Sequence, residues 1–379
     1  MPTPSALIAA SFCMAAVAIA TIPDALRAHR SRAPGPRPIG ITHVTVIDVE
    51  RGTRLRDQTL IIEGSRIATI GLSSQVRVPD GYGVVEARGK FVIPGLIDTH
   101  TLLERDGAAA APENAVRRLE RFVALGVTTI RTLDARAIRT TDGMLAPRVN
   151  IAGRVDSAAI VQAQAAGAAD LTHQLIQRGV DGIAIGSDLT LDDLRAIVEL
   201  AHADKKPVFG VGSANDPDFA TDAVLTGIDG LVHVAGSDSL IRLMIKRGVW
   251  LQPALVTDES SSMKDFVRRF RVAGGVVITG TAGQTPNAMG IHDELRLLVE
   301  AGLTPAAALR AATFDAARAL RWQDRVGSVT RNKLADLLVL DADPLEDIRN
   351  TARINAIVID GRFIDAAERD QLLARGRVR

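Results

Sequence analysis

The stretch FVIPGLIDTH (91–100) ends a short apolar run abruptly in polar residues, as a buried strand with a functional end does. Seven more apolar runs follow it, and the chain between them is long enough for a helix or a long loop. These runs are TTIRTL (128–133), RVNIAG (148–153), GIAI (182–185), PVFGV (207–211), GLVHV (230–234), VWLQP (249–253) and VVITG (276–280). Eight such units within about 240 residues predict an α/β fold, a (β/α)8 TIM barrel.

The chain between the runs supports this prediction. In LTLDDLRAIVELAHADKK (189–206) the apolar residues recur at helical spacing on one stripe. A doubly wound sheet is the weaker alternative, because no glycine-rich phosphate loop follows the first run. Barrel enzymes carry their chemistry where the strands end, so the ends of the eight runs are the places to search for a site.

Both ends of the predicted barrel are flanked by β-rich sequence. ITHVTVIDV (41–49) and the runs after it precede the barrel, while KLADLLVLDADP (333–344) and INAIVIDGRFID (354–365) follow it. Gly, Asp and Pro separate these runs, as they do in small antiparallel units. We therefore expect a composite β-sandwich domain from residues 38–92 plus 331–366, with the barrel domain, 93–330, inserted into it.

The bulk composition excludes several classes of function. Hydrophobic residues make up 47% and charged residues 23% of the chain, which predicts a globular protein. The 45 basic and 44 acidic residues leave a net charge of +1, and only 3% of residues are aromatic, so we expect no nucleic-acid partner. The single cysteine, Cys13, precedes the folded part, which therefore has no internal disulfide, thiolate nucleophile or zinc thiolate.

Residues 1–37 form an apolar leader and a linker. The leader, ALIAASFCMAAVAIA (6–20), is uncharged and ends in a small-x-small pattern typical of signal-peptide cleavage. Arg27, Arg30 and Arg32 follow it rather than precede it, which keeps a membrane anchor as an alternative, and a disordered tail is a third. We expect an exported protein, periplasmic or membrane-anchored.

Five motifs occur in an order that resembles a known family. They are GKFVIPGLIDTH (89–100), LGVTTIRTLD (125–134), AVLTGIDGLVHVAG (223–236), HDELRLLVEAGLTPAAALRAATFDAARAL (292–320) and GSVTRNKLADLLVLDADPLEDI (327–348). Together they resemble the amidohydrolase superfamily, most closely its imidazolonepropionase-like and prolidase-like branch. The resemblance extends from about Ile41 to Asp365.

The resemblance implies a site with one or two divalent metals, usually zinc, which activate a bound water. It assigns the ligands to two histidines after strand 1, a lysine on strand 4, histidines on strands 5 and 6, and an aspartate on strand 8 that is also the general base. The residues at these positions are His100 and Leu102, then Ala184, then Val211 or Ser213, then His233, and finally Ala282.

Only His100 and His233 match the assigned ligands. A catalytic zinc needs three protein ligands and a water, so we expect no metal cofactor. We predict a pseudoenzyme with a degenerate metal site that binds a small-molecule ligand or a partner, and leave a homo-oligomer open. The alternative is a hydrolase of small non-peptide or peptide-like amide C–N bonds with a depleted site, so enzymatic activity stays an open question.

Other polar residues near the run ends have simpler interpretations. We interpret His100 and His233 as inherited, neutral, hydrogen-bonded histidines, and Asp98 as a residue that fixes the turn after the first run. Asp106, Asp134 and Asp188 follow runs and are interpreted as loop residues.

Two further histidines fall on predicted helices. His202 precedes strand 5 within a helix and is a poor substitute for its missing ligand. His292 opens a helix whose next residues, Asp293 and Glu294, suit the positive N-terminal end. No serine lies in a Gly-x-Ser-x-Gly setting, so a serine-hydrolase triad has no support.

Overall fold

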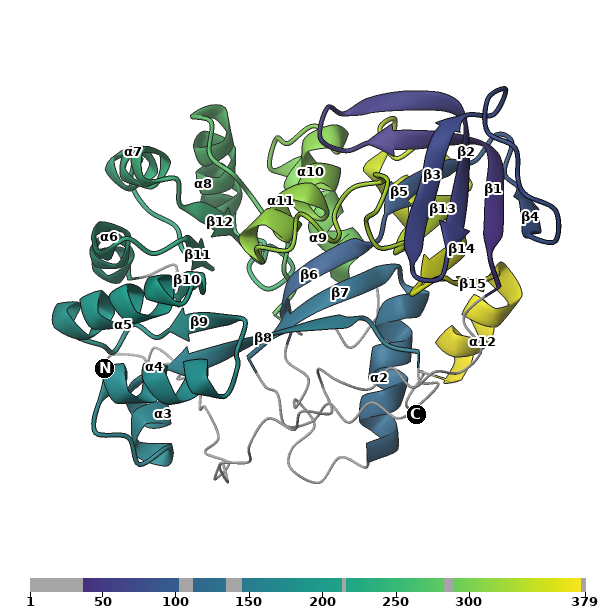
Figure 1. Ribbon diagram of the computed structural model, residues 1–379. Coiled ribbons are helices and arrows are strands. Elements are labelled where there is room, and N and C mark those ends of the chain that lie inside the picture. The colour runs from purple at the N-terminus through teal and green to yellow at the C-terminus, as the bar shows by residue number, and fades with distance from the viewer. Residues whose placement is uncertain (1–36, 102–111, 134–144, 213–215, 283–289, 376–379) are drawn as a thin grey trace, which may run out of the picture.

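Two β-sheets with very different strand pairing make up the protein (Figure 1). The computed structural model describes residues 37–101, 112–133, 145–212, 216–282 and 290–375. The N-terminal leader and the loop aspartates Asp106 and Asp134 lie outside these ranges. Within the described residues, no helix combines the length and the apolar character needed to cross a membrane.

The first sheet combines strands from both ends of the chain. Its order is β15-β14-β13-β5-β1-β2-β3, with β4 paired to β1. The strands are β1 (Ile39–Asp48), β2 (Thr53–Glu63), β3 (Arg66–Leu72), β4 (Gly83–Glu86), β5 (Phe91–Pro94), β13 (Leu337–Leu340), β14 (Ile354–Ile359) and β15 (Arg362–Ile364). These strands come from both ends of the chain and pair into one continuous sheet, so a β-sandwich is not confirmed.

The second sheet is parallel and curled. Its order, β12-β11-β10-β9-β8-β7-β6, follows the sequence, as successive βα units dictate. The strands are β6 (Leu96–Thr101), β7 (Val127–Thr132), β8 (Arg148–Val155), β9 (Gly182–Ile185), β10 (Val208–Val211), β11 (Gly230–Val232) and β12 (Trp250–Gln252). All seven coincide with predicted runs, because strands buried on both faces are short continuous apolar segments.

The eighth predicted run lies between the two edges of this sheet. Val277 forms a parallel bridge with Leu251 of β12. On the other side, the Thr99 N–H of β6 donates to the Thr279 carbonyl at 3.1 Å. The protein is therefore an α/β fold with a curled parallel sheet whose edges meet through residues 276–279, an arrangement consistent with the predicted barrel.

Helices lie on the outer side of the curled sheet (Figure 1). They are α2 (Pro112–Ala124), α3 (Ser157–Gln162), α4 (Ala168–Gln177), α5 (Leu191–Ala203), α6 (Pro217–Thr226), α7 (Asp238–Arg247), α8 (Ser261–Val272), α9 (Gly290–Glu300), α10 (Pro305–Ala311), α11 (Phe314–Ala319), the 3-10 helix η1 (Ile348–Ala352) and α12 (Ala366–Arg375). Helix α5 was predicted. It begins at a capping box made by Thr190 and Asp193, and it buries the stripe of Leu194, Ile197 and Ala201.

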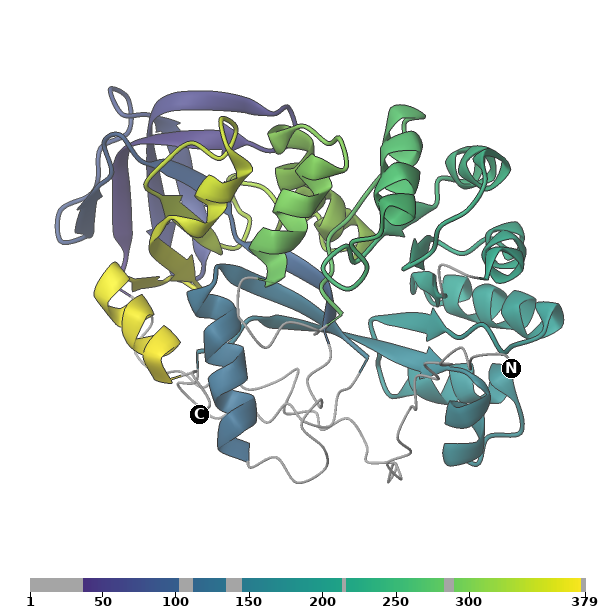
Figure 2. The same cartoon turned by 180° about the vertical axis from the view of Figure 1, so that it is seen from behind.

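The C-terminal helix α12 was not predicted. Its apolar content is low, and only Leu372 is buried. It packs beside α2 at the barrel's edge (Figure 2). Helix α12 therefore covers α2 instead of extending the composite sheet.

Candidate functional site

His100 lies near the end of β6 and is 8% exposed. Burial lowers its pKa to about 4, and the positive charge of Arg131 acts in the same direction, while the side chain of Gln252 opposes the shift. The imidazole is therefore neutral at pH 7, as the sequence suggested. Its Nδ1 is buried and lacks a hydrogen-bond partner among the described residues.

His233 follows β11 at the same end of the sheet, and its side chain is 34% exposed. Its Nε2 lies 3.7 Å from Asp258 Oδ2, too far for a hydrogen bond. Burial would raise the pKa of Asp258, but hydrogen bonds from Ser260 and the nearby His233 outweigh it and lower that pKa. Asp258 is thus an ionised carboxylate at the mouth of the site, and the sequence analysis missed it because it lies beyond the run end.

The other assigned ligand positions that the structure describes carry no metal-binding group. Ala184 on β9 is 1% exposed and belongs to an apolar cluster with Phe209 and Trp250. Val211 ends β10 and packs against the same cluster. Ala282 follows the eighth run. Leu102 and Ser213 lie outside the described residues.

Asp98 has the structural role expected of it. One oxygen accepts hydrogen bonds from the His100 N–H at 3.1 Å and the Thr281 N–H at 3.0 Å, and the other accepts from the Thr281 hydroxyl at 2.6 Å. Burial raises its pKa to about 6 against the effect of these bonds. Asp98 therefore ties β6 to the end of the eighth run and is poorly placed to rescue a metal.

Arg131 on β7 is the largest polar side chain that the sequence analysis overlooked, and it is 2% exposed. Its Nε donates to the Thr99 carbonyl at 2.7 Å, and its guanidinium lies 3.8 Å from the centre of the Phe209 ring and 5.4 Å from that of Trp250. Burial lowers its pKa to about 9, so it stays charged at pH 7. Both terminal nitrogens lack hydrogen-bond partners among the described residues.

A signal for Arg131 was present in the sequence. A charged residue inside a strand that is buried on both faces has to face either the helices or the barrel axis. Gln252 in VWLQP is a similar case: it is fully buried, and its amide donates to the Gly280 carbonyl at 3.0 Å. Both side chains add polar atoms to an otherwise apolar lumen.

Glu294 is a buried carboxyl whose burial was not predicted from the sequence. It was expected near the positive N-terminal end of a helix, and in α9 it is fully buried and accepts a 2.9 Å hydrogen bond from the Val256 N–H. Burial raises its pKa to about 8, and the nearby charge of Asp98 contributes to the shift. Glu294 therefore holds the loop after β12 as a protonated carboxyl at neutral pH.

The two histidines on the predicted helices, His202 and His292, have structural partners. His292 was placed on a helix face, but it is 5% exposed, and it makes hydrogen bonds with the Thr351 hydroxyl at 2.9 Å and the Leu125 carbonyl at 3.0 Å. His202 lies in α5 as predicted and pairs with Asp229 at 2.9 Å. Neither histidine is directed at the site, in agreement with the sequence analysis.

Three strand ends at this site carry left-handed residues that are not glycine. His233, Ala254 and Ala282 have φ values of 53°, 53° and 51°. Such a conformation costs about 1 kcal/mol or more for an alanine, and it clusters at functional sites. Ala282 thus keeps an unusual backbone while its methyl group offers no chemistry.

The family's metal does not fit the described residues. Nowhere in the described ranges do three or more His, Cys, Asp or Glu side chains gather so that they could hold a metal ion. His100 and His233 supply two nitrogens, one short of a catalytic zinc site. The buried charge of Arg131, which already acts on His100, opposes a dication as well.

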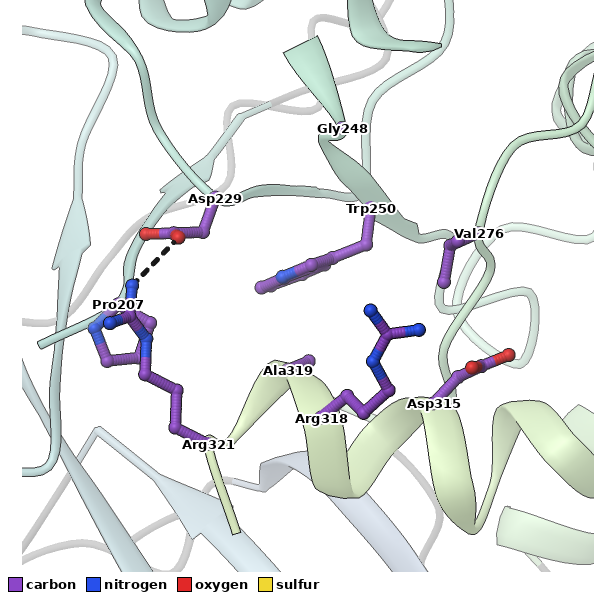
Figure 3. Close-up of a pocket in the computed structure, with 9 residues that line it drawn as sticks. All are labelled: Pro207, Asp229, Gly248, Trp250, Val276, Asp315, Arg318, Ala319 and Arg321. Carbon is purple, nitrogen blue, oxygen red and sulfur yellow. Dashed lines mark hydrogen bonds and ion pairs between the residues drawn. The ribbon is translucent and has the colours of Figure 1, made fainter. Parts of the chain in front are cut away.

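A cavity of about 220 Å³ lies at the opposite end of the curled sheet, where the strands begin (Figure 3). Trp250, Ala319, Pro207 and Val276 supply its apolar lining. The histidines lie at the carboxyl ends of their strands, so this cavity is separate from the candidate site.

Comparisons with known proteins agree with the resemblance found in the sequence. The model of the amidohydrolase family matches residues 91–364. An uncharacterised protein of Mycobacterium tuberculosis is 28% identical over 82% of this chain and 94% of its own. The imidazolonepropionase of Micrococcus luteus is 28% identical over 80% of this chain and 92% of its own. The crystal structure of phenylurea hydrolase B covers 87% of this chain and 97% of its own at 22% identity, with a TM-score of 0.73.

Proposed function

This chain belongs to the amidohydrolase family, and we propose that it is a homologue with a degraded metal centre that binds a small molecule or a partner without hydrolysing it. The proposed frame is a complete (β/α)8 barrel, with residues 276–279 as its eighth strand, inserted into the composite β-domain. The observation that carries the proposal is the chemistry of Ala184 and Ala282. Their methyl groups stand where the resemblance places the strand 4 lysine and the general base.

The losses at the site form a consistent set. A buried lysine or aspartate without a metal is an unpaired charge that costs several kcal/mol. Small apolar residues at positions 184 and 282 avoid that cost. The apolar cluster around Ala184, which includes Phe209 and Trp250, supports the same interpretation, because a lysine there would enter a packed lumen.

One observation favours a hydrolase as the second candidate. Asp258 is an ionised carboxylate 3.7 Å from His233, and the two groups lie at the mouth of the site. A histidine beside a carboxylate is a plausible general base for attack of water on a small amide. This arrangement would act without the strand 8 aspartate.

A substrate panel separates the two candidates. The full chain is assayed against cyclic amides, small peptide-like amides and lactones, with chelator and with added zinc, beside the His233→Ala variant. We expect no turnover above that of the variant under any of these conditions. Hydrolysis that is lost in His233→Ala would overturn the non-catalytic proposal, and loss of that hydrolysis on chelation would assign it to a metal.

A further inference from the structure

The cavity at the N-terminal end of the barrel strands has the lining of a small-molecule site (Figure 3). Trp250 is 7% exposed, and its indole lies among the side chains that converge on the cavity. Gly230 makes this position available to the ring, because a Cβ there would lie 2.1 Å from an indole carbon. Ala319 of α11 is 6% exposed and leaves room opposite the ring. The indole ring therefore gives the cavity one flat aromatic wall.

Of the two arginines in the lining, Arg321 pairs with Asp229, whereas Arg318 makes no hydrogen bond or ion pair within the described part of the chain. It is exposed on α11, and Figure 3 shows its side chain rising from the helix toward Trp250. Asp315 is three residues away on the same helix, but Asp315 Oδ2 accepts from Arg310 at 3.0 Å. The guanidinium of Arg318 thus has its donors available at the edge of the cavity.

The charged groups on the other wall are already paired. Asp229 accepts from Arg321 at 3.1 Å, from the Val208 N–H at 2.7 Å, and it pairs with His202 at 2.9 Å. The ion pair with Asp229 holds the Arg321 side chain at that wall (Figure 3). Because these charges already compensate one another, the positive charge of Arg318 determines that a ligand of this cavity should be negatively charged.

We propose that this cavity binds a small monocarboxylate with a flat apolar body. The carboxylate would pair with the Arg318 guanidinium, whose fork matches two oxygens, while the body lies against Trp250 and Ala319. A cationic ligand has no available acceptor except Asp315 Oδ1, which is buried beneath the surface and lies in a carboxylate already paired with Arg310. A volume of about 220 Å³ suits a molecule of the size of benzoate.

This site is independent of the proposed function. The Phe209, Trp250 and Ala319 side chains belong to one apolar cluster, which separates the cavity from the histidine end of the barrel. Loss or retention of metal chemistry at that end leaves the lining of the cavity unchanged.

The probe is benzoate, with benzamide and benzylamine as matched neutral and cationic compounds. Binding to the full chain is followed by Trp250 fluorescence in a Trp322→Phe background, because the protein has only two tryptophans. We expect saturable quenching by benzoate and at least tenfold weaker binding of benzamide and benzylamine.

Three variants locate the site. Arg318→Gln, an exposed change, should weaken benzoate binding about tenfold or more, as loss of a charge-assisted pair does. Ala319→Leu should abolish binding by filling the cavity while Arg318 remains. The control, Arg325→Gln, is made in the same Trp322→Phe background; it removes an arginine that lies over the ring at position 322 and is not part of the cavity lining, and it should leave the affinity unchanged.

Equal binding of benzoate and benzamide, or tighter binding of benzylamine, would overturn the proposal. The same holds if benzoate binds the Arg318→Gln or the Ala319→Leu variant as tightly as the parent. Absence of saturable benzoate binding to the parent would also overturn it. None of these results depends on whether the histidine end hydrolyses an amide.

Discussion

Two arginines with largely buried side chains lie on neighbouring strands, and they differ in their polar partners. Arg148 begins β8, with its side chain 10% exposed, and it pairs with Asp336, whose side chain is 2% exposed, and with Asp360 at 3.4 Å. Arg131 in β7 is buried at least as deeply, yet its terminal nitrogens have no hydrogen-bond partner among the described residues. Among the described residues, the arginine at the end of the barrel that meets the composite sheet has charged partners, and the arginine of the lumen has none within hydrogen-bond distance.

The paired arginine belongs to the junction between the two sheets, and the unpaired one belongs to the lumen. Asp336 belongs to the segment that leads into β13, so its pair with Arg148 joins the composite sheet to the barrel. Asp336 also accepts from the Asp360 N–H at 3.1 Å, which adds β14 to the junction. In the lumen, Asp98 is the charged group among the described residues that acts on the pKa of Arg131, and its oxygens already accept hydrogen bonds from His100 and Thr281.

The largest effect is expected at the junction. Asp336→Asn should lower the free energy of unfolding by about 3 kcal/mol, because it leaves the Arg148 charge buried with only the more distant Asp360. Urea denaturation of the variant and the parent measures this. Asp48→Asn is the matched control: its partner Arg51 is 80% exposed, and a loss below about 1 kcal/mol is expected. Equal losses of unfolding free energy in the two variants would mean that the buried pair at the junction contributes no more than the exposed pair at the surface.

The second prediction concerns pH and Glu294. Its raised pKa, about 8, means that the folded state holds a proton that the unfolded state releases above about 4.5. Stability from this group is fully present below pH 4.5 and is lost as the pH rises to 8. Asp98, with a pKa of about 6, has largely completed its contribution by pH 7. The two buried histidines, His100 and His292, have folded pKa values of about 4 against 6.5 in the unfolded chain, so they oppose the fall until the pH is well above 6.5.

Between pH 7 and 8 the free energy of unfolding should therefore fall by about 0.7 kcal/mol. Denaturant melts across this range measure the slope. Glu294→Gln keeps an oxygen for the Val256 N–H, and in this variant the fall of the unfolding free energy with pH should disappear. A slope that persists in this variant would assign the titration to another group.

The third prediction tests the other arginine of the pair. Arg131→Met removes an unpaired buried charge and keeps an apolar chain against Phe209, so the change in unfolding free energy should be about 1 kcal/mol or less, of either sign. The same urea experiment applies. A loss as large as that of Asp336→Asn would mean that Arg131 has an effective partner in the lumen.

The sequence predicted the strands of the barrel more fully than the site. GIAI (182–185) coincides with β9, because both faces of the strand are buried and every residue is apolar. The burial of Glu294 was not predicted, since its helical spacing tells which residues share a face but not that the Val256 N–H lies there to donate to it. Arg131 was overlooked for the same reason. Sequence patterns give burial, whereas the partner of a polar group is decided by contacts between distant segments.

The smallest effect is expected at Ala282. Its φ of 51° is unfavourable for alanine, and glycine adopts it freely. Ala282→Gly should raise the free energy of unfolding by about 0.5 kcal/mol, after the greater flexibility of glycine in the unfolded chain is subtracted. Thermal melts of variant and parent test this, with Ala273→Gly at the right-handed end of α8 as the control that should destabilise. A destabilised Ala282→Gly would mean that its methyl group packs usefully in the site.

Zinc stoichiometry of the purified full chain tests the dismantled metal centre most directly. Equilibrium dialysis against zinc is compared for the parent, Leu102→His, and the triple variant Leu102→His, Ala184→Lys and Ala282→Asp. We expect no tight zinc in the parent, weak binding in the single variant with its third imidazole, and stronger binding in the triple variant. One tightly held zinc per chain in the parent, removed together with an amidase activity by chelator, would contradict the loss of the centre.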